Sequence, residues 1–226
     1  ATIDAGVGID SLIFATSMDG VISGIYSAGE FVSFGSGAVS ALFADSTLIS
    51  SSIYGGTNSD SFVFNSNIIA NTAIANAITL DAGAGADSLT FRGSFQGTIS
   101  SLNSINEFVS FSSSGATVAF TSGIGTGSSV LSGTGNDSFL FNQAVGAATI
   151  DAGAGLDSLN FASTMTGTRV NLGASSDQLI ATLAAIGVTI DAGAEADTLR
   201  FNSTFSGSIS GLYESAEYVS FGSNAS

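Results

Sequence analysis

The sequence predicts an all-β fold, a parallel β-solenoid of about ten coils with a roughly 20-residue repeat, in a single domain that spans residues 1-226. Three observations lead to this prediction. A 13-residue stretch recurs along the chain, acidic residues fall at a regular interval, and apolar and polar residues alternate in short segments. A chain that repeats itself in this way is interpreted first as a stacked array.

The recurring stretch is TIDAGAGLDSLNF at residues 149–161. Close copies occupy residues 2–14, 79–91 and 189–201, and looser copies occupy residues 53–64 and 131–141. One acidic residue, Asp157 in the first of these, opens the D-S-L-x-F half of each copy, and we call its equivalents the anchor acids. The anchor acids are Asp10, Glu30, Asp60, Asp87, Glu107, Asp137, Asp157, Asp177, Asp197 and Glu217.

The spacing of the anchor acids defines the repeat. Six of the nine intervals are 20 residues, and the other three are 30, 27 and 30, so the unit is 20 residues with insertions of ten, seven and ten. A longer duplication relates residues 10–60 to residues 87–137 at an offset of 77. A β-sandwich or barrel of short strands is the alternative fold, but it gives no reason for a fixed 20-residue register.

Each unit carries two strand signals. Ser158-Leu159-Asn160-Phe161 alternates polar and apolar residues, which is typical of a half-buried strand, and Thr149-Ile150 typifies a shorter second strand. A glycine ten residues after the anchor acid, such as Gly187, predicts a turn between them. Gln178–Ile186 is ambiguous between strand and helix.

Stacked coils are expected to align equivalent apolar residues into internal ladders. The first predicted ladder comprises Phe14, Phe34, Phe64, Phe91, Phe111, Phe141, Phe161, Phe201 and Phe221. The second comprises Leu12, Val32, Phe62, Leu89, Val109, Phe139, Leu159, Leu179, Leu199 and Val219. Ala181 interrupts the first ladder, and we expect Leu183 or Ile186 to fill that place.

Composition limits the partners. Three arginines stand against 18 acidic residues, for a net charge of −15, so nucleic acid and anionic membrane surfaces are poor partners and divalent cations are natural ones. No apolar run approaches the ~20 residues needed to cross a bilayer, so no membrane insertion is expected. Because the chain begins with Ala1 and shows no signal-peptide pattern, we expect it to be a processed or excised piece of a longer product.

The turn D-A-G-x-G-x-D carries the candidate chemistry. Its glycines allow positive φ and close approach of the backbone to an ion or to the next coil. Residues 82–90, AGAGADSLT, resemble the calcium-binding nonapeptide G-G-x-G-x-D-x-U-x of RTX proteins, which are secreted bacterial toxins, proteases and surface-layer proteins. Residues 55–63 and 133–140 resemble it more loosely. The resemblance implies secretion from a bacterium and Ca²⁺ between successive coils.

The candidate calcium ligands are Asp4, Asp10, Asp60, Asp81, Asp87, Asp137, Asp151, Asp157, Asp191 and Asp197. A physical argument also favours a cation. Equivalent acids on coils ~4.8 Å apart repel one another, and 14 of the 18 acids could lie along one edge. Cations, backbone N–H donors or raised pKa values relieve such a column. The alternative, that each Asp only caps its own turn, stays open; Asp177, in a turn without the second glycine, is the weakest candidate.

These features point to a structural role. We expect a secreted bacterial protein, a subunit of an extracellular fibre or surface layer, whose open ends stack head-to-tail on other copies of the chain. The alternative is a calcium-responsive RTX-like module of a larger adhesin or exported enzyme. No enzymatic activity is expected, because His, Cys and Lys are absent. Polymerisation of the isolated chain and unfolding by a chelator distinguish the two hypotheses.

Overall fold

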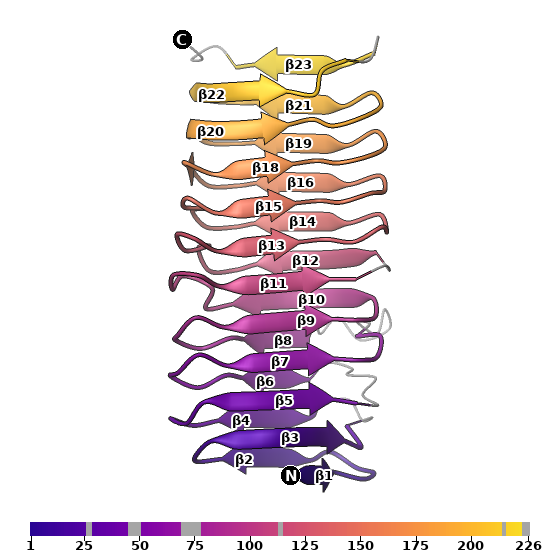
Figure 1. Ribbon diagram of the computed structural model, residues 1–226, viewed down its shortest axis with the longest axis vertical. Coiled ribbons are helices and arrows are strands. Elements are labelled where there is room, and N and C mark those ends of the chain that lie inside the picture. The colour runs from indigo at the N-terminus through magenta and orange to yellow at the C-terminus, as the bar shows by residue number, and fades with distance from the viewer. Residues whose placement is uncertain (26–28, 45–50, 69–77, 113–114, 214–215, 223–226) are drawn as a thin grey trace.

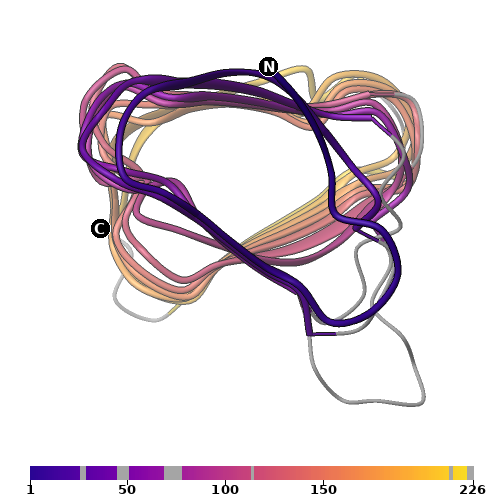
Figure 2. The same ribbon diagram turned by 90° about the horizontal axis from the view of Figure 1, so that it is seen from below.

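The computed structural model describes residues 1–25, 29–44, 51–68, 78–112, 115–213 and 216–222. These residues form a column of stacked parallel β coils with the two chain ends at opposite ends of the column (Figure 1). Along the axis the coils superimpose on a single outline, as Figure 2 shows. The predicted β-solenoid of about ten coils with a roughly 20-residue repeat is therefore confirmed. Within the described residues there is no helix of the length and apolarity that a membrane crossing requires.

Two parallel sheets form the long sides of the column. We call them sheet A, which faces the viewer in Figure 1, and sheet B behind it. Sheet A contains β1 (Thr2–Asp4), β3 (Met18–Ser23), β5 (Val39–Phe43), β7 (Ser61–Phe64), β9 (Ser88–Phe91), β11 (Phe108–Phe111), β13 (Ser129–Leu131), β15 (Thr149–Asp151), β17 (Met165–Thr166), β18 (Arg169–Asn171), β20 (Ala185–Asp191) and β22 (Phe205–Ser210). Sheet B contains β2 (Ser11–Phe14), β4 (Phe31–Phe34), β6 (Ser52–Tyr54), β8 (Ile78–Asp81), β10 (Phe95–Ser100), β12 (Ala116–Phe120), β14 (Ser138–Phe141), β16 (Ser158–Phe161), β19 (Gln178–Ala181), β21 (Thr198–Phe201) and β23 (Tyr218–Phe221).

Alternation along each strand fills the space between the sheets. In β16, Leu159 and Phe161 are buried, whereas Ser158 and Asn160 lie on the outer surface and are only half-buried. The next coil repeats the arrangement in register, with Leu179 beside Leu159. The predicted strands and their inward-facing residues are thus confirmed. The ambiguous segment Gln178–Ile186 consists of β19 and the first residues of β20, both strands.

The phenylalanines do not form one ladder, so this prediction is wrong. Phe64, Phe91 and Phe111 stack in sheet A, with ring centroids 5.0 Å apart at each step. Phe14, Phe34, Phe141, Phe161, Phe201 and Phe221 belong to sheet B. The second predicted ladder divides in the same way, with Phe62, Leu89 and Val109 in sheet A and the others in sheet B.

The ten-residue insertions explain the division. A coil contributes one strand to each sheet, so ten extra residues add half a coil and move the next D-S-L-x-F strand to the opposite sheet. The insertion before Asp60 moves the D-S-L-x-F strand from sheet B to sheet A, and the insertion before Asp137 moves this strand back to sheet B. Each inserted half-coil supplies a strand ending in phenylalanine. Phe43 stacks on Phe64 at 4.7 Å, and Phe120 stacks on Phe141 at 4.8 Å, so each displaced strand meets a phenylalanine in its new sheet.

Two smaller expectations are also wrong. Leu183 and Ile186 are about half exposed, so neither fills the place beside Ala181. Among the glycines ten residues after the anchor acids, Gly167 lies at a bend between β17 and β18, as predicted, but the other four do not make turns. Gly20, Gly97, Gly187 and Gly207 lie inside strands, and Gly187 sits at a register shift between β20 and β22.

The D-A-G-x-G-x-D turns, in contrast, depend on glycine. At Gly173 the backbone has φ +98°, and a Cβ there would lie 1.7 Å from the carbonyl oxygen of Gly153 in the preceding coil. Gly153 and Gly193 show the same crowding against Gly133 and Gly173, respectively. The turns therefore stack backbone on backbone, in a conformation that residues with a Cβ rarely adopt.

Candidate functional site: the buried acid ladders

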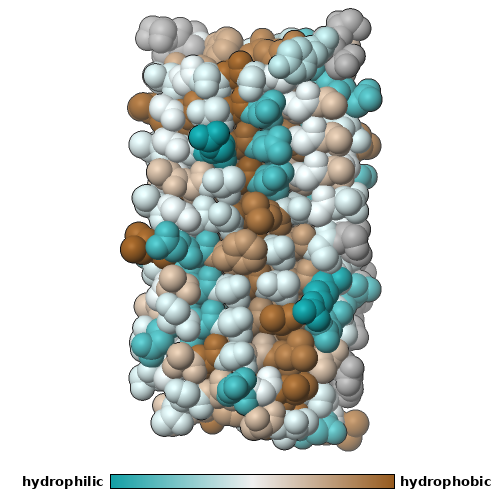
Figure 3. Space-filling view, in the orientation of Figure 1, coloured by the Kyte–Doolittle hydropathy of each residue, from teal (hydrophilic) through white to brown (hydrophobic). Residues whose placement is uncertain are grey.

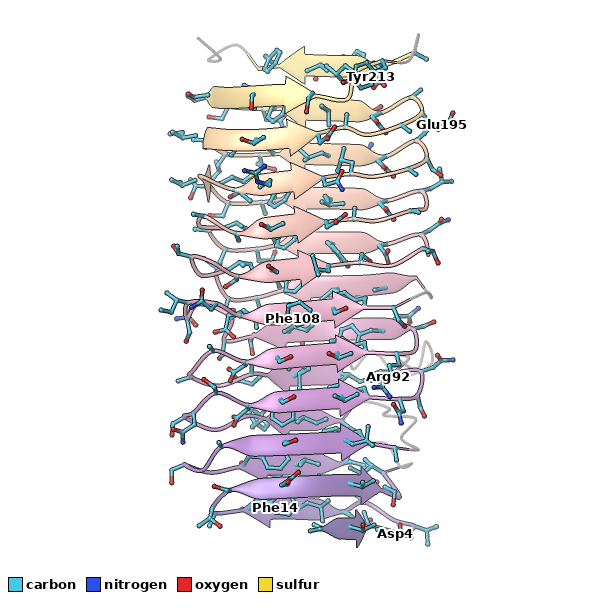
Figure 4. The ribbon with its side chains drawn as sticks, in the orientation of Figure 1. Asp4, Phe14, Arg92, Phe108, Glu195 and Tyr213 are labelled. Atoms are coloured by element: carbon cyan, nitrogen blue, oxygen red, sulfur yellow. The ribbon has the colours of Figure 1, made fainter. Side chains whose placement is uncertain are left out.

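The acidic residues lie at two edges of the column rather than one. Strands of sheet A and sheet B run in opposite directions, so turns that lead into sheet B lie at one edge and turns that lead into sheet A at the other (Figure 1). Asp60, Asp81, Asp87 and Glu107 lie at turns that lead into sheet A, and the other ten of the 14 acids lie at turns of the opposite edge, where Figure 4 labels Asp4. The expected single edge of 14 acids is thus wrong, because the half-coil insertions divide it.

At the edge leading into sheet B, anchor acids form a series we call the long acid ladder: Asp137, Asp157, Asp177, Asp197 and Glu217. The backbone N–H groups of the four Asp residues each donate to the carboxylate of the next coil, in four consecutive bonds of 2.8, 2.8, 2.7 and 3.0 Å. The Asp side chains of this ladder are at most 3% exposed. Each carboxylate therefore caps the coil before its own, an arrangement that only a regular stack provides.

The same contact recurs at the other edge in the short acid ladder, Asp60, Asp87 and Glu107. The N–H of Asp60 donates to Asp87 Oδ1 and that of Asp87 to Glu107 Oε2, both at 2.8 Å. Ser128 Oγ ends the series by accepting the Glu107 N–H at 3.0 Å. Near the N-terminus, the Asp10 N–H donates to Glu30 Oε2 at 2.7 Å. Glu30 and Glu107 therefore accept the same backbone N–H bond that Asp accepts on other coils.

Asp60 and Asp137 accept hydrogen bonds on both carboxylate oxygens, whereas most other ladder carboxylates use one oxygen and leave the other without a partner. Among the described residues, the buried oxygens that accept no hydrogen bond include Asp87 Oδ2, Glu107 Oε1, Asp157 Oδ2, Asp177 Oδ2 and Asp197 Oδ2. A buried anion whose second oxygen has no donor is unfavourable, since desolvation penalises the charged form. A proton on that oxygen removes the charge.

The pKa values follow from this environment. Burial raises the pKa of Asp87, Asp157 and Asp197 to about 6 and that of Glu107 and Asp177 to about 7, while the N–H bonds oppose the rise. Neighbouring carboxylates raise these pKa values further. Burial also raises the pKa of Asp60 and Asp137. The ladders therefore bind protons far more readily than exposed carboxylates do.

The acids that open the turns behave differently. Oδ1 of Asp4, Asp81 and Asp151 accepts the N–H two residues ahead, from Gly6, Gly83 and Gly153, at 3.1, 3.0 and 3.2 Å. This is the Asx turn that capping predicts. Asp191 occupies the equivalent place on β20 and is exposed. These acids therefore cap their own turns, whereas the anchor acids cap the preceding coil.

Among the described residues, the candidate calcium ligands do not gather into a cluster of three or more carboxylates. Calcium takes six to eight oxygens that converge on one point, and no group of three or more acidic side chains converges in this way within the described ranges. The carboxylates of Asp60, Asp87, Asp137, Asp157 and Asp197 are buried and accept backbone N–H bonds, and those of Asp4, Asp81 and Asp151 cap their own turns. Of the two remaining candidates, neither Asp10 nor the exposed Asp191 belongs to a group of three acids within the described residues.

We therefore expect the fold to be independent of calcium. Millimolar Ca²⁺ or an excess of chelator is expected to leave the thermal unfolding midpoint unchanged, because the ladders are held by N–H donors and protons. Differential scanning calorimetry with Ca²⁺, with chelator and with Mg²⁺ as a control for ionic strength measures this. A rise of several degrees specific to Ca²⁺ would show that the turns hold the ion.

The rest of the surface offers little that resembles a site. The outer face of sheet A is even, with a narrow apolar strip beside polar residues (Figure 3). Arg92, Arg169 and Arg200 are exposed, as surface charges are expected to be, and Arg92 and Arg200 bond Asn65 and Asn202 at 2.9 and 2.8 Å. An open hollow on sheet B, lined in part by Gln178, Arg200 and Tyr218, contains no acidic residue among its lining side chains.

The structure thus defines the class: a parallel β-solenoid with buried carboxyl ladders at its edges. Comparison with protein-family models, with curated proteins and with solved structures gives no match to this chain.

Proposed function

We propose that this chain is a secreted structural protein, a subunit of an extracellular fibre or surface layer that assembles by head-to-tail stacking of solenoid coils. The observation that carries the proposal is the partial exposure of apolar side chains in the two end coils. Leu12 and Phe14 of the first coil are only partly buried, whereas their neighbours Val32 and Phe34 in the next coil are at most 4% exposed. Each end therefore presents an unfinished core.

The C-terminal end shows the same feature. Phe221 is 51% exposed, whereas Phe201 directly beneath it is 1% exposed. The strands β1, β2, β22 and β23 each pair on one edge only, within the described chain. Unpaired parallel edges over half-exposed apolar side chains favour association with another coil of the same shape. Figure 4 labels Phe14 near one end and Tyr213 near the other.

Two further features support the proposal. The body of the column repeats one arrangement throughout, which suits a structural element, and the chain lacks His, Cys and Lys, the usual bases and nucleophiles. An extracellular location is supported by the acidic composition and by the likeness of the turns to those of RTX proteins. Immunogold labelling of intact source cells tests this part of the proposal.

Filament formation is the direct test. Electron microscopy over a concentration series is expected to show unbranched filaments one solenoid wide, with a subunit repeat of roughly 50 Å from about ten coils at ~4.8 Å each. Val219→Asp, which adds a charge to the end coil, is expected to prevent assembly. Leu183→Asp, the same change at an exposed position in the body, is expected to leave filaments intact. Only monodisperse particles at every concentration, with and without Ca²⁺, would refute the proposal.

A further inference from the structure

The first anchor acid and the last acid of the long acid ladder each lack one half of the contact that joins neighbouring acids within a ladder. Inside the column an anchor acid donates its N–H to the carboxylate of the following coil. Glu217 is the last of the long acid ladder, and its N–H has no acceptor within the described residues. Asp10 is the first anchor acid, and within the described residues no backbone N–H of a preceding coil donates to its carboxylate.

From this complementarity we infer that the head-to-tail joint between two copies has one fixed register, in which the Glu217 N–H of one copy donates to the Asp10 carboxylate of the next. This inference rests on the proposed stacking and specifies its geometry. The partner is a second copy of this chain. The joint continues the acid ladder from the C-terminal coil of one copy into the N-terminal coil of the next.

The strands at the two ends support this register. With the acids aligned, β2 would pair with the free edge of β23, and Leu12 and Phe14 would lie over Val219 and Phe221. The same pairing inside the column sets Leu199 and Phe201 beside Val219 and Phe221. The partly exposed side chains at each end thus meet residues of matching type.

Sheet A gives a second, independent match. In the column, Ser129–Leu131 is followed by Thr149–Asp151, residue for residue. At the joint, Ser208–Ser210 of β22 would be followed by Thr2–Asp4 of β1, so a Thr-Ile-Asp strand again stacks on a strand with Ser at its first position. Ile3 would then lie over Ile209, and both are partly buried in the single chain. Both sheets therefore continue across the joint in a single register.

Disulfide trapping tests this register directly. The chain has no cysteine, and in-register parallel neighbours place their Cα atoms within the 4.4–6.8 Å range, roughly, that a disulfide spans. Thr2→Cys with Ser208→Cys is expected to give a ladder of covalent oligomers on a non-reducing gel after mild oxidation. The control pair, Thr2→Cys with Ser206→Cys, is shifted by two residues and is expected to stay monomeric. Thr2, Ser206 and Ser208 are all exposed in the single chain.

The acid contact is tested at Asp10. Asp10→Ala removes the acceptor and is expected to raise the critical concentration for filament growth about tenfold. Asp10→Asn keeps an acceptor oxygen and is expected to assemble at nearly the wild-type concentration. Asp19→Ala, which removes an exposed acid at the same end, controls for the loss of charge. Within the described residues the Asp10 carboxylate accepts no hydrogen bond, so the thermal midpoint of Asp10→Ala is expected to match that of the wild type.

The outcomes separate the joint from the proposed function. Filaments in which the in-register cysteines do not crosslink, or in which Asp10→Ala and Asp10→Asn behave alike, would overturn the joint and leave head-to-tail stacking standing. Absence of filaments and of oligomers from any cysteine pair would overturn both. Crosslinking of the Thr2–Ser208 pair alone, together with a defect confined to Asp10→Ala, supports the joint.

Discussion

Asp177→Asn is expected to stabilise the protein at pH 8 by roughly 2–4 kcal/mol, since burial raises the pKa of Asp177 from 3.8 to about 7 and the ionised form is therefore disfavoured in the folded state. The amide keeps an oxygen to accept the Asp157 N–H, now bonded at 2.8 Å, and carries no charge. Near pH 4 the carboxyl is already neutral in the folded state. The gain is expected to vanish there.

The sign of this effect follows from the direction of the shift. A group whose pKa is raised on folding contributes stability below its unfolded pKa and loses it as the pH rises through its folded pKa. The ladder pKa values run up to about 7, so the wild-type unfolding free energy is expected to be greatest near pH 4 and to fall until about pH 8. Chemical denaturation at several pH values measures both curves.

Two variants control the comparison. Asp191→Asn changes an exposed acid and is expected to have little effect at either pH. Asp177→Ala removes the acceptor as well as the charge, so the buried Asp157 N–H loses its bond and the variant is expected to be about 1–3 kcal/mol less stable than Asp177→Asn. An Asp177→Asn protein less stable than wild type at pH 8 would contradict the proton-binding account of the ladders.

Gly173→Ala is the second large effect. We expect a loss of about 2–5 kcal/mol, the sum of about 1–2 for a left-handed backbone with a Cβ and about 1–3 for the forced contact with Gly153. The added Cβ would meet a backbone atom, the carbonyl oxygen of Gly153. This oxygen already accepts the Ala174 N–H at 3.0 Å. The coils cannot separate without breaking this bond.

Gly187→Ala provides the matched control. Gly187 also has a positive φ, +65°, but its nearest neighbour to an added Cβ is 3.8 Å away. This variant is expected to lose only the conformational part, about 1–2 kcal/mol. Urea denaturation of the two variants isolates the cost of the close contact between turns. Equal losses in both would show that the turns have room for a Cβ.

Repetition in the sequence predicts most of the fold. The 20-residue spacing implies stacked coils, and the alternation in segments such as Ser158–Phe161 identifies the buried residues, because a period of two leaves one face for the core. The single phenylalanine ladder is wrong for a reason also visible in the sequence. An insertion of ten residues equals half a unit, and Phe43 and Phe120 precede the displaced strands with the same terminal phenylalanine.

The site is only partly predictable. Spacing identifies every anchor acid, yet it does not reveal that Asp157 caps the coil before its own, since that depends on the direction in which each side chain points. The weakest candidate from the turn sequence, Asp177, lies in the middle of the long acid ladder, because the ladder requires the acid and its place in the coil rather than both glycines. The sequence spacing of the Glu anchor acids equals that of the Asp anchor acids, so spacing alone could have identified them as site residues too.

The half-coil insertions have a consequence for the exterior of the column. The outward-facing residues of a D-S-L-x-F segment lie on one side of the column before such an insertion and on the opposite side after it. Ser33 of β4 and Thr90 of β9 illustrate this change of side. A column of this kind can thus be given two different outer surfaces by the insertion of a half-coil. The packing between the sheets is maintained, since each inserted half-coil supplies a phenylalanine that stacks on the displaced strand.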